Sequence, residues 1–98
     1  MFDSFSEIFA SKLRLMVVSA LFVGQKDFTT LKKLTGATDG NLGRQMEILV
    51  TNGFVNMTKE SVGKRSRTTY CLSNEGRNAL INYVDELSNI IGGDAGTK

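Results

Sequence analysis

Histidine is absent from this 98-residue sequence, and cysteine occurs only once, as Cys71. Without histidine the chain cannot contain a Ser-His or Cys-His nucleophile pair, and one thiol cannot supply the ligands of an ordinary zinc site. A phosphate-binding loop of the GxxxxGK[ST] type is missing as well. We therefore expect neither an enzyme nor a protein that depends on a metal or another cofactor. A single cysteine also excludes an intrachain disulfide, which is typical of proteins in the reducing cytoplasm.

Long hydrophobic runs are also lacking, because no uninterrupted apolar stretch exceeds four residues, as at 15–18. A membrane-spanning helix needs roughly 20 apolar residues, and the first residues carry no basic segment of the kind that begins a signal peptide. The apolar residues, 41% of the total, are spread from Phe2 to Ile91. This spread and the short length predict one globular, cytoplasmic domain over residues 1–92, with no membrane partner.

Helical periodicity dominates the first 53 residues. We expect an N-terminal helical region over 1–24, followed by two short helices over 27–53. In the second of these helices Leu42, Met46 and Leu49 recur at i, i+4 and i+7, which predicts a buried face. Two short helices joined around a glycine are typical of a helix-turn-helix.

The periodicity changes to strand-like alternation over residues 54–72, which predicts a β-hairpin. Its turn, at 63–66, lacks the tight Asn-Gly sequence, so we expect a mobile tip. A last helix is predicted over 73–92. The glycine pair Gly92-Gly93 is expected to end it and to leave a disordered tail at 93–98.

Positive charge is concentrated in the hairpin. Residues 59–67 contain four of the twelve cationic residues and one of the ten acidic residues, a local formal charge of +3, whereas the whole chain carries +2. A basic cluster on one element is the electrostatic feature that a polyanion-binding protein presents.

Six segments between about residue 11 and residue 85 occur in a characteristic order. They are Leu13-Arg14-Leu15, Phe28-Thr29-Thr30-Leu31-Lys32, Thr38-Asp39-Gly40-Asn41-Leu42, Asn52-Gly53-Phe54-Val55, Gly63-Lys64-Arg65-Ser66-Arg67-Thr68-Thr69-Tyr70 and Leu72-Ser73-Asn74-Glu75-Gly76-Arg77. The set resembles the winged-helix domain of MarR-like and ArsR-like transcriptional regulators, especially the compact one-domain type. The resemblance implies a mainly α fold with a small β-hairpin (α+β): a helix, a helix-turn-helix, a wing and a C-terminal helix. The Cys and His ligands of the metal-sensing ArsR-like proteins are largely missing here, so metal sensing is not implied.

The resemblance also implies that the second helix of the helix-turn-helix enters the major groove of DNA. If Leu42, Met46 and Leu49 are buried, Arg44 points outward, where it is expected to contact guanine, and Asn41 beside it could contact adenine. Alternatively, Arg44 is only solvent-exposed and Asn41 only completes the helix cap. Glycines permit close approach to DNA, and the start of the helix suits a phosphate. The expected DNA-binding residues are Thr38, Gly40, Asn41, Gly43, Arg44, Lys64, Arg65 and Arg67.

The last helix carries a broad apolar stripe whose main residues follow the i, i+4, i+7, i+11 spacing of a coiled-coil seam. One domain of this size cannot easily cover this stripe together with the N-terminal phenylalanines, so a homodimer is predicted. Alternatively, both ends pack within one chain. A two-fold dimer implies a pseudo-palindromic operator in double-stranded DNA. The expected interface residues are Phe2, Phe5, Phe9, Leu80, Tyr83, Val84, Leu87 and Ile91.

The leading hypothesis is therefore a sequence-specific, homodimeric DNA-binding transcriptional regulator. Two other hypotheses remain: a winged-helix module whose apolar stripe binds another protein, and a sequence-independent chromatin-like or RNA-binding protein. The basic hairpin favours nucleic acid over a pure protein-interaction role. No polar cluster in the sequence indicates a pocket for a small effector.

Overall fold

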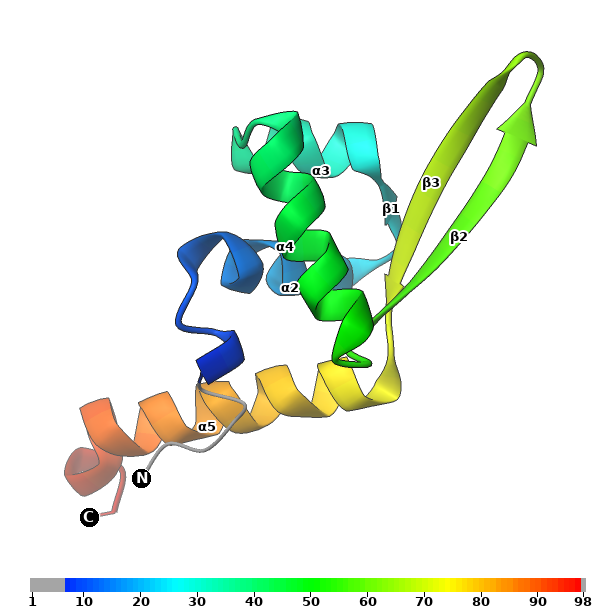
Figure 1. Cartoon of the computed structure of the whole chain (residues 1–98). Helices are drawn as coiled ribbons and strands as arrows, with labels where there is room; N and C mark the ends of the chain where they lie inside the picture. Colours follow the sequence, from blue (N-terminus) through cyan, green and yellow to red (C-terminus); the bar gives the residue numbers. More distant parts are fainter. Residues whose placement is uncertain (1–6, 98) are drawn as a thin grey trace.

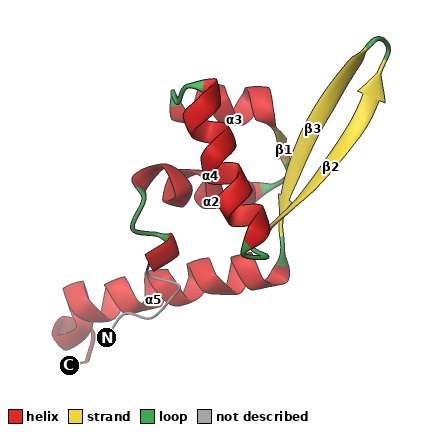
Figure 2. Ribbon diagram, in the orientation of Figure 1, coloured by secondary structure: helices red, strands yellow, loops and turns green. Residues whose placement is uncertain are grey.

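The computed structural model describes residues 7–97 of the chain, and side chains as far as residue 92. The elements follow one another in the order expected for a helix, a helix-turn-helix, a hairpin and a final helix (Figures 1 and 2). They are α2 (Lys12–Val23), β1 (Lys26–Asp27), α3 (Phe28–Thr35), α4 (Asp39–Thr51), β2 (Val55–Val62), β3 (Arg65–Leu72) and α5 (Asn74–Thr97). The predicted fold class is confirmed.

Polar side chains cap the helices at their starts. The Oγ1 of Thr38 accepts a hydrogen bond from the backbone N–H of Asn41 at 3.1 Å, and the Oγ of Ser73 accepts one from that of Gly76 at 2.9 Å. Each bond satisfies one of the amides that a helix leaves unpaired in its first turn. Asp27 caps α3 in the same way. Because short hydroxyl and carboxylate side chains favour this position, the sequence predicts Thr38 and Ser73 as caps and offers Asp27 or Thr29 for α3. The structure confirms the first two predictions and selects Asp27 for the third.

Four helix ends are predicted from glycines that can adopt the left-handed conformation: Gly24, Gly36, Gly53 and the pair Gly92-Gly93. Gly36 and Gly53 follow α3 and α4 with positive φ, as expected, whereas the other two predictions need correction. Gly24 does end α2, but its φ of 166° is extended backbone and not the expected left-handed conformation. Helix α5 continues past Gly92-Gly93 to Thr97, which overturns the expected end at residue 92. A glycine lowers helix stability by only about 1 kcal/mol, and Gly92 does not adopt the left-handed conformation that would end the helix.

The sheet has three antiparallel strands in the order β1-β3-β2. Strand β1 was not expected from the sequence; it pairs Lys26 with Tyr70 and Asp27 with Thr69. Two residues are too short to show alternation, so only the fold reveals this strand. Strand β1 ties the base of the hairpin to the start of α3.

The hairpin turn is tighter than predicted. Val62 pairs with Arg65, so only Gly63 and Lys64 connect the strands. Gly63 has a φ of +64°, whereas no non-glycine residue among those described has a positive φ. A glycine with positive φ followed by a residue with negative φ is the pattern of a type II′ turn, whose twist matches that of the strands. The tip of the wing is therefore a defined two-residue turn.

The core lies where α2, α3, α4 and the base of the hairpin meet. The largest fully buried side chains come from all of these elements: Leu21, Leu31, Leu42, Met46, Leu49, Val17, Val18 and Val55. Helix α5 closes this core from below (Figure 1). It approaches so closely that a Cβ on Gly76 would collide with the carbonyl oxygen of Phe54. Burial of this apolar surface provides the main stabilisation of the fold.

Candidate nucleic-acid interface

Helix α4 has one buried face and one exposed face. Leu42, Met46 and Leu49 are at most 1% exposed, which confirms the predicted core face. Arg44 and Glu47 therefore project to solvent, as does Asn41 in the first turn. Gly40 is also exposed, whereas Gly43 is half-buried beside Met57 and Tyr70 of the hairpin. A convex helix with an exposed arginine and amide has the dimensions and the donors to enter the major groove.

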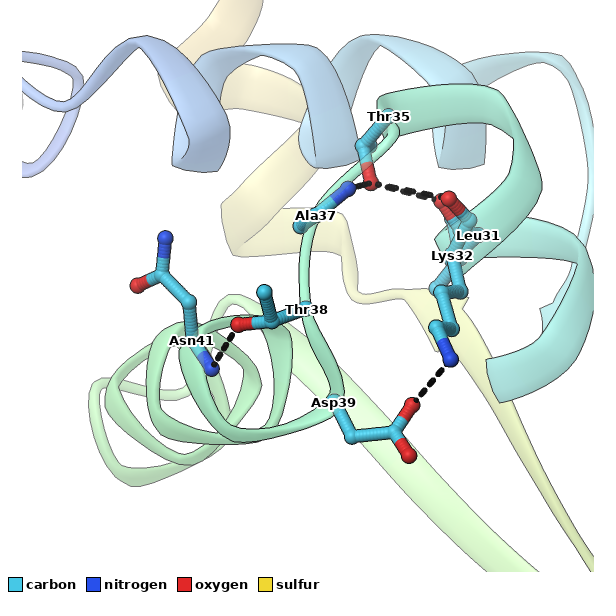
Figure 3. Close-up of polar contacts among 7 residues, drawn as sticks. All are labelled: Leu31, Lys32, Thr35, Ala37, Thr38, Asp39 and Asn41. Atoms are coloured by element: carbon cyan, nitrogen blue, oxygen red, sulfur yellow. Dashed lines mark hydrogen bonds and ion pairs between the residues drawn. The ribbon is translucent and has the colours of Figure 1, made fainter.

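The start of α4 is held against α3 by a set of local contacts (Figure 3). Lys32 of α3 forms an ion pair with Asp39, the first residue of α4, at 2.7 Å. The Oγ1 of Thr35 donates to the carbonyl of Leu31 at 2.8 Å and accepts from the N–H of Ala37 at 3.3 Å. Together with the Thr38 cap these contacts fix the angle between the two helices. As a result, Thr38 Oγ1 already accepts a hydrogen bond within the domain. The charge of Lys32 is likewise partly neutralised by Asp39 before any ligand binds.

A chain of hydrogen bonds runs from the N-terminal segment through α2 to α4. The Arg14 Nε donates to the carbonyl of Ile8 at 2.7 Å, and Arg14 Nη1 donates to Gln45 Oε1 at 2.6 Å. The Gln45 Nε2 then donates to Asn41 Oδ1 at 3.3 Å. Neither Arg14 nor Gln45 was predicted from the sequence to belong to the site. The available signal was a single charged residue inside the apolar stretch of α2, where a cation needs a partner.

The wing carries the predicted cations Lys64, Arg65 and Arg67, all exposed. Arg67 is not free of partners, because its Nε lies 4.0 Å from Asp27 Oδ2. The Asp27 Oδ1 accepts the backbone N–H of Thr30 at 2.8 Å. Hydrogen bonds from Thr30, with a smaller contribution from the Arg67 charge, hold the pKa of Asp27 below its ordinary value. Asp27 thus anchors the base of the wing to α3 while remaining ionised.

The start of α4 and the tip of the wing lie on the same side of the molecule, opposite α5 (Figure 1). An open groove of about 410 Å³ separates the wing from the start of α3, and Arg65, Arg67 and Thr29 contribute to its walls. The structure therefore brings the predicted residues of α4 and of the wing to one end of the domain.

The predicted dimer residues divide into two groups. Phe9 is 3% exposed and packs within its own chain, with ring centroids 6.4 Å from Phe54 and 5.0 Å from Tyr83. Leu80 is also buried in the single chain, in the same core cluster as Phe9. Phe2 and Phe5 lie outside the described residues.

Among the remaining apolar residues, Val84 and Ile91 are 49% and 81% exposed and form, with the half-buried Leu87, what we call the outer α5 face. Ile81 and Ile90 are also exposed, on the two flanks of this face. No described helix is long and apolar enough to cross a membrane. An exposed apolar helix face of this kind is a candidate surface for contact with another protein chain.

Comparison with known proteins gives the family. Residues 13–91 match the family described as "Winged helix DNA-binding domain". An uncharacterised protein of Methanocaldococcus jannaschii is 33% identical over 82 residues, which cover 83% of this chain and 89% of that protein.

Solved structures agree in fold. A transcriptional regulator homologue from Pyrococcus horikoshii superimposes with a TM-score of 0.82 at 26% identity, over 90% of this chain and 88% of the other. The homodimeric winged helix-turn-helix DNA-binding domain of Mycobacterium bovis gives a TM-score of 0.76 at 14% identity, over 91% and 80% of the two chains. The chain therefore belongs to the family of winged-helix DNA-binding domains.

Proposed function

We propose that this protein regulates transcription by binding a specific double-stranded DNA sequence as a homodimer, with α4 in the major groove and the wing on the DNA backbone or in the minor groove. The observation that carries the proposal is the common location of the exposed start of α4 and the tip of the basic wing on one side of the domain, opposite α5. Family membership and the regulators among its structural neighbours support the same role.

Helix α4 supplies the base contacts in this proposal. Arg44 is exposed, and none of the ion pairs in the described part of the chain involves it, so its guanidinium is available to bind guanine O6 and N7 together. Glu47 lies one turn further along the same face and disfavours phosphates there by charge repulsion. The first turn of α4, with its free amides and Asn41, is therefore the part of the helix that lies deepest in the groove.

The outer α5 face supplies the dimer contact. Its apolar side chains remain exposed after the single chain has folded, and covering them with a second copy removes them from water. The M. bovis neighbour is a homodimer, which supports this arrangement. Two-fold symmetry places two α4 helices on one side of the dimer, so the operator is expected to be a pseudo-palindrome.

The test is selection of bound sequences from a randomised duplex pool with purified protein, followed by titration of the selected site. The expected result is a two-fold symmetric site whose preference at one base position relaxes in Arg44→Ala, with a loss of about 1–3 kcal/mol on the preferred site. Lys12→Ala, which removes an exposed cation of α2 outside the predicted DNA-binding residues, is the matched control and should bind like wild type. If no duplex is enriched, the proposal is wrong and a protein-interaction module becomes the better hypothesis.

A further inference from the structure

We infer that Arg14 and Gln45 are positioning residues that fix which atoms of the Asn41 side chain face the DNA, so that Asn41 acts as a hydrogen-bond donor and selects a keto base, guanine or thymine. The inference rests on the proposed function and specifies one of its base contacts. It replaces the expectation, drawn from the sequence, that Asn41 binds adenine.

The first step is the orientation of Gln45. The Arg14 side chain carries only N–H donors, so the Gln45 atom that lies 2.6 Å from Arg14 Nη1 has to be the amide oxygen. The second hydrogen bond of Arg14, from Nε to the Ile8 carbonyl at 2.7 Å, holds the guanidinium in place. With its oxygen committed to Arg14, Gln45 can present only its NH₂ group to the neighbouring turn of α4.

The second step is the orientation of the Asn41 amide, which the fixed orientation of Gln45 determines. The Gln45 Nε2 is 3.3 Å from Asn41 Oδ1, so the Asn41 oxygen is turned toward Gln45. The backbone N–H of Asn41 donates to the Thr38 hydroxyl, whereas the Asn41 side chain accepts its hydrogen bond from Gln45. Among the described residues, Asn41 Nδ2 has no acceptor. The exposed side chain therefore offers two N–H donors, and Figure 3 shows it directed away from the Thr38 turn.

The third step is the match with the bases. Guanine presents the acceptors O6 and N7 in the major groove, and thymine presents O4. Adenine and cytosine present amino groups there, which cannot accept a hydrogen bond from Asn41 Nδ2. Adenine therefore offers this donor group only N7, one acceptor fewer than guanine, and cytosine offers it none. The familiar pair of hydrogen bonds between asparagine and adenine needs Oδ1 toward the amino group, and Gln45 holds that oxygen elsewhere. One neutral hydrogen bond corresponds to roughly a fivefold preference for keto over amino bases.

The test begins by locating the base that Asn41 contacts, as the position of the selected site whose preference disappears in Asn41→Ala. Four duplexes that differ only at that position are then titrated with each variant. Wild-type protein should bind the guanine and thymine duplexes roughly fivefold more tightly than the other two. Gln45→Glu still accepts from Arg14 but accepts from Asn41 instead of donating to it. Asn41 should then turn its amide over, and the preference should move to adenine and cytosine.

Two further variants separate this role from a merely structural one. Gln45→Met removes both hydrogen bonds while keeping the size of the side chain, and it should flatten the preference without reversing it. Thr51→Glu places the same added charge on the exposed side of α4, beyond the hydrogen-bond chain, and should weaken all four duplexes alike while keeping their order. Thermal melting checks that every variant is folded.

The inference is overturned if Asn41→Ala changes no base preference, or if Gln45→Glu keeps the keto preference of wild type. Either result leaves the proposed function intact as long as wild-type protein still selects a specific site. Failure of wild-type protein to select any site counts against the proposed function itself, so the two failures are distinguishable.

Discussion

Replacing Gly43 by alanine should stabilise the protein and weaken its binding to DNA. Gly43 lies in the interior of α4, and a Cβ at this position would have no atom within 4 Å apart from its chain neighbours and its own helix. Alanine is better than glycine in a helix interior by about 0.5–1 kcal/mol. In a domain of this size 1 kcal/mol corresponds to roughly 4–8 °C in Tm, so a rise of about 2–8 °C is expected in thermal melting.

The effect on DNA should have the opposite sign. Gly43 lies at the border between the exposed α4 face and the hairpin, beside Met57 and Tyr70. A DNA strand that passes between α4 and the wing approaches the backbone of α4 at this glycine, and an added methyl group then has to be accommodated. By analogy with an overpacked site, we expect the added methyl group to reduce the binding free energy by about 1–3 kcal/mol. The reduction is measured as a weaker Kd when the selected duplex is titrated and followed by fluorescence anisotropy.

A matched control exists on the other side of the molecule. Gly92 is also a helical glycine whose Cβ would have open space, but it lies on α5, opposite the wing. Gly92→Ala should leave the DNA affinity unchanged. If Gly43→Ala raises the Tm and binds DNA as tightly as wild type, α4 does not approach DNA at Gly43, and the proposed docking of this helix is wrong.

Three further predictions concern the wing, the dimer and acid stability. Changing Lys64, Arg65 and Arg67 to alanine should weaken binding to specific and random DNA alike and reduce the salt dependence by about 0.9 in log–log slope for each phosphate that the wing no longer neutralises, with the Tm nearly unchanged. Val84→Arg, on the outer α5 face, should convert a dimer into a folded monomer by light scattering; monomeric wild-type protein would contradict the proposed dimer. Because Asp27 has a lowered pKa when folded, its stabilising contribution is present above its unfolded pKa, near 4, and is lost as the pH falls through the folded pKa. Asp27→Asn, which keeps a strong helix cap, should therefore show a weaker loss of Tm between about pH 5 and pH 2.

The elements that depend on local pattern could be predicted from the sequence. The spacing of Leu42, Met46 and Leu49 predicts the buried face of α4 because a helix places residues four and seven apart on one side, and all three are buried. Thr38 predicts the start of that helix because its hydroxyl can satisfy a free backbone amide. These inferences need no knowledge of what the helix packs against.

The features that the sequence did not predict depend on residues far apart in the chain. Strand β1 exists because Lys26 and Asp27 meet the distant strand β3. Phe9 is an intramolecular core residue because the N-terminal segment folds back onto Tyr83, whereas its spacing alone suits an intermolecular contact equally well. Gly76 has no local signature that distinguishes it from Gly43, yet at Gly76, unlike Gly43, the backbone of another segment occupies the position of a side chain.

Charge illustrates the same limit and refines the prediction for the wing. Composition counts Arg67 as one of the wing cations, but the fold places it beside Asp27. In the described part of the chain, Lys64 and Arg65 belong to no ion pair. Removing Arg67 also leaves the Asp27 carboxylate without this ion pair, so the variant changes the electrostatic field on a phosphate through two charges instead of one. A Lys64→Ala/Arg65→Ala double variant is therefore the cleaner measure of backbone contact: it should account for most of the change in salt dependence while leaving the contacts of Asp27 intact.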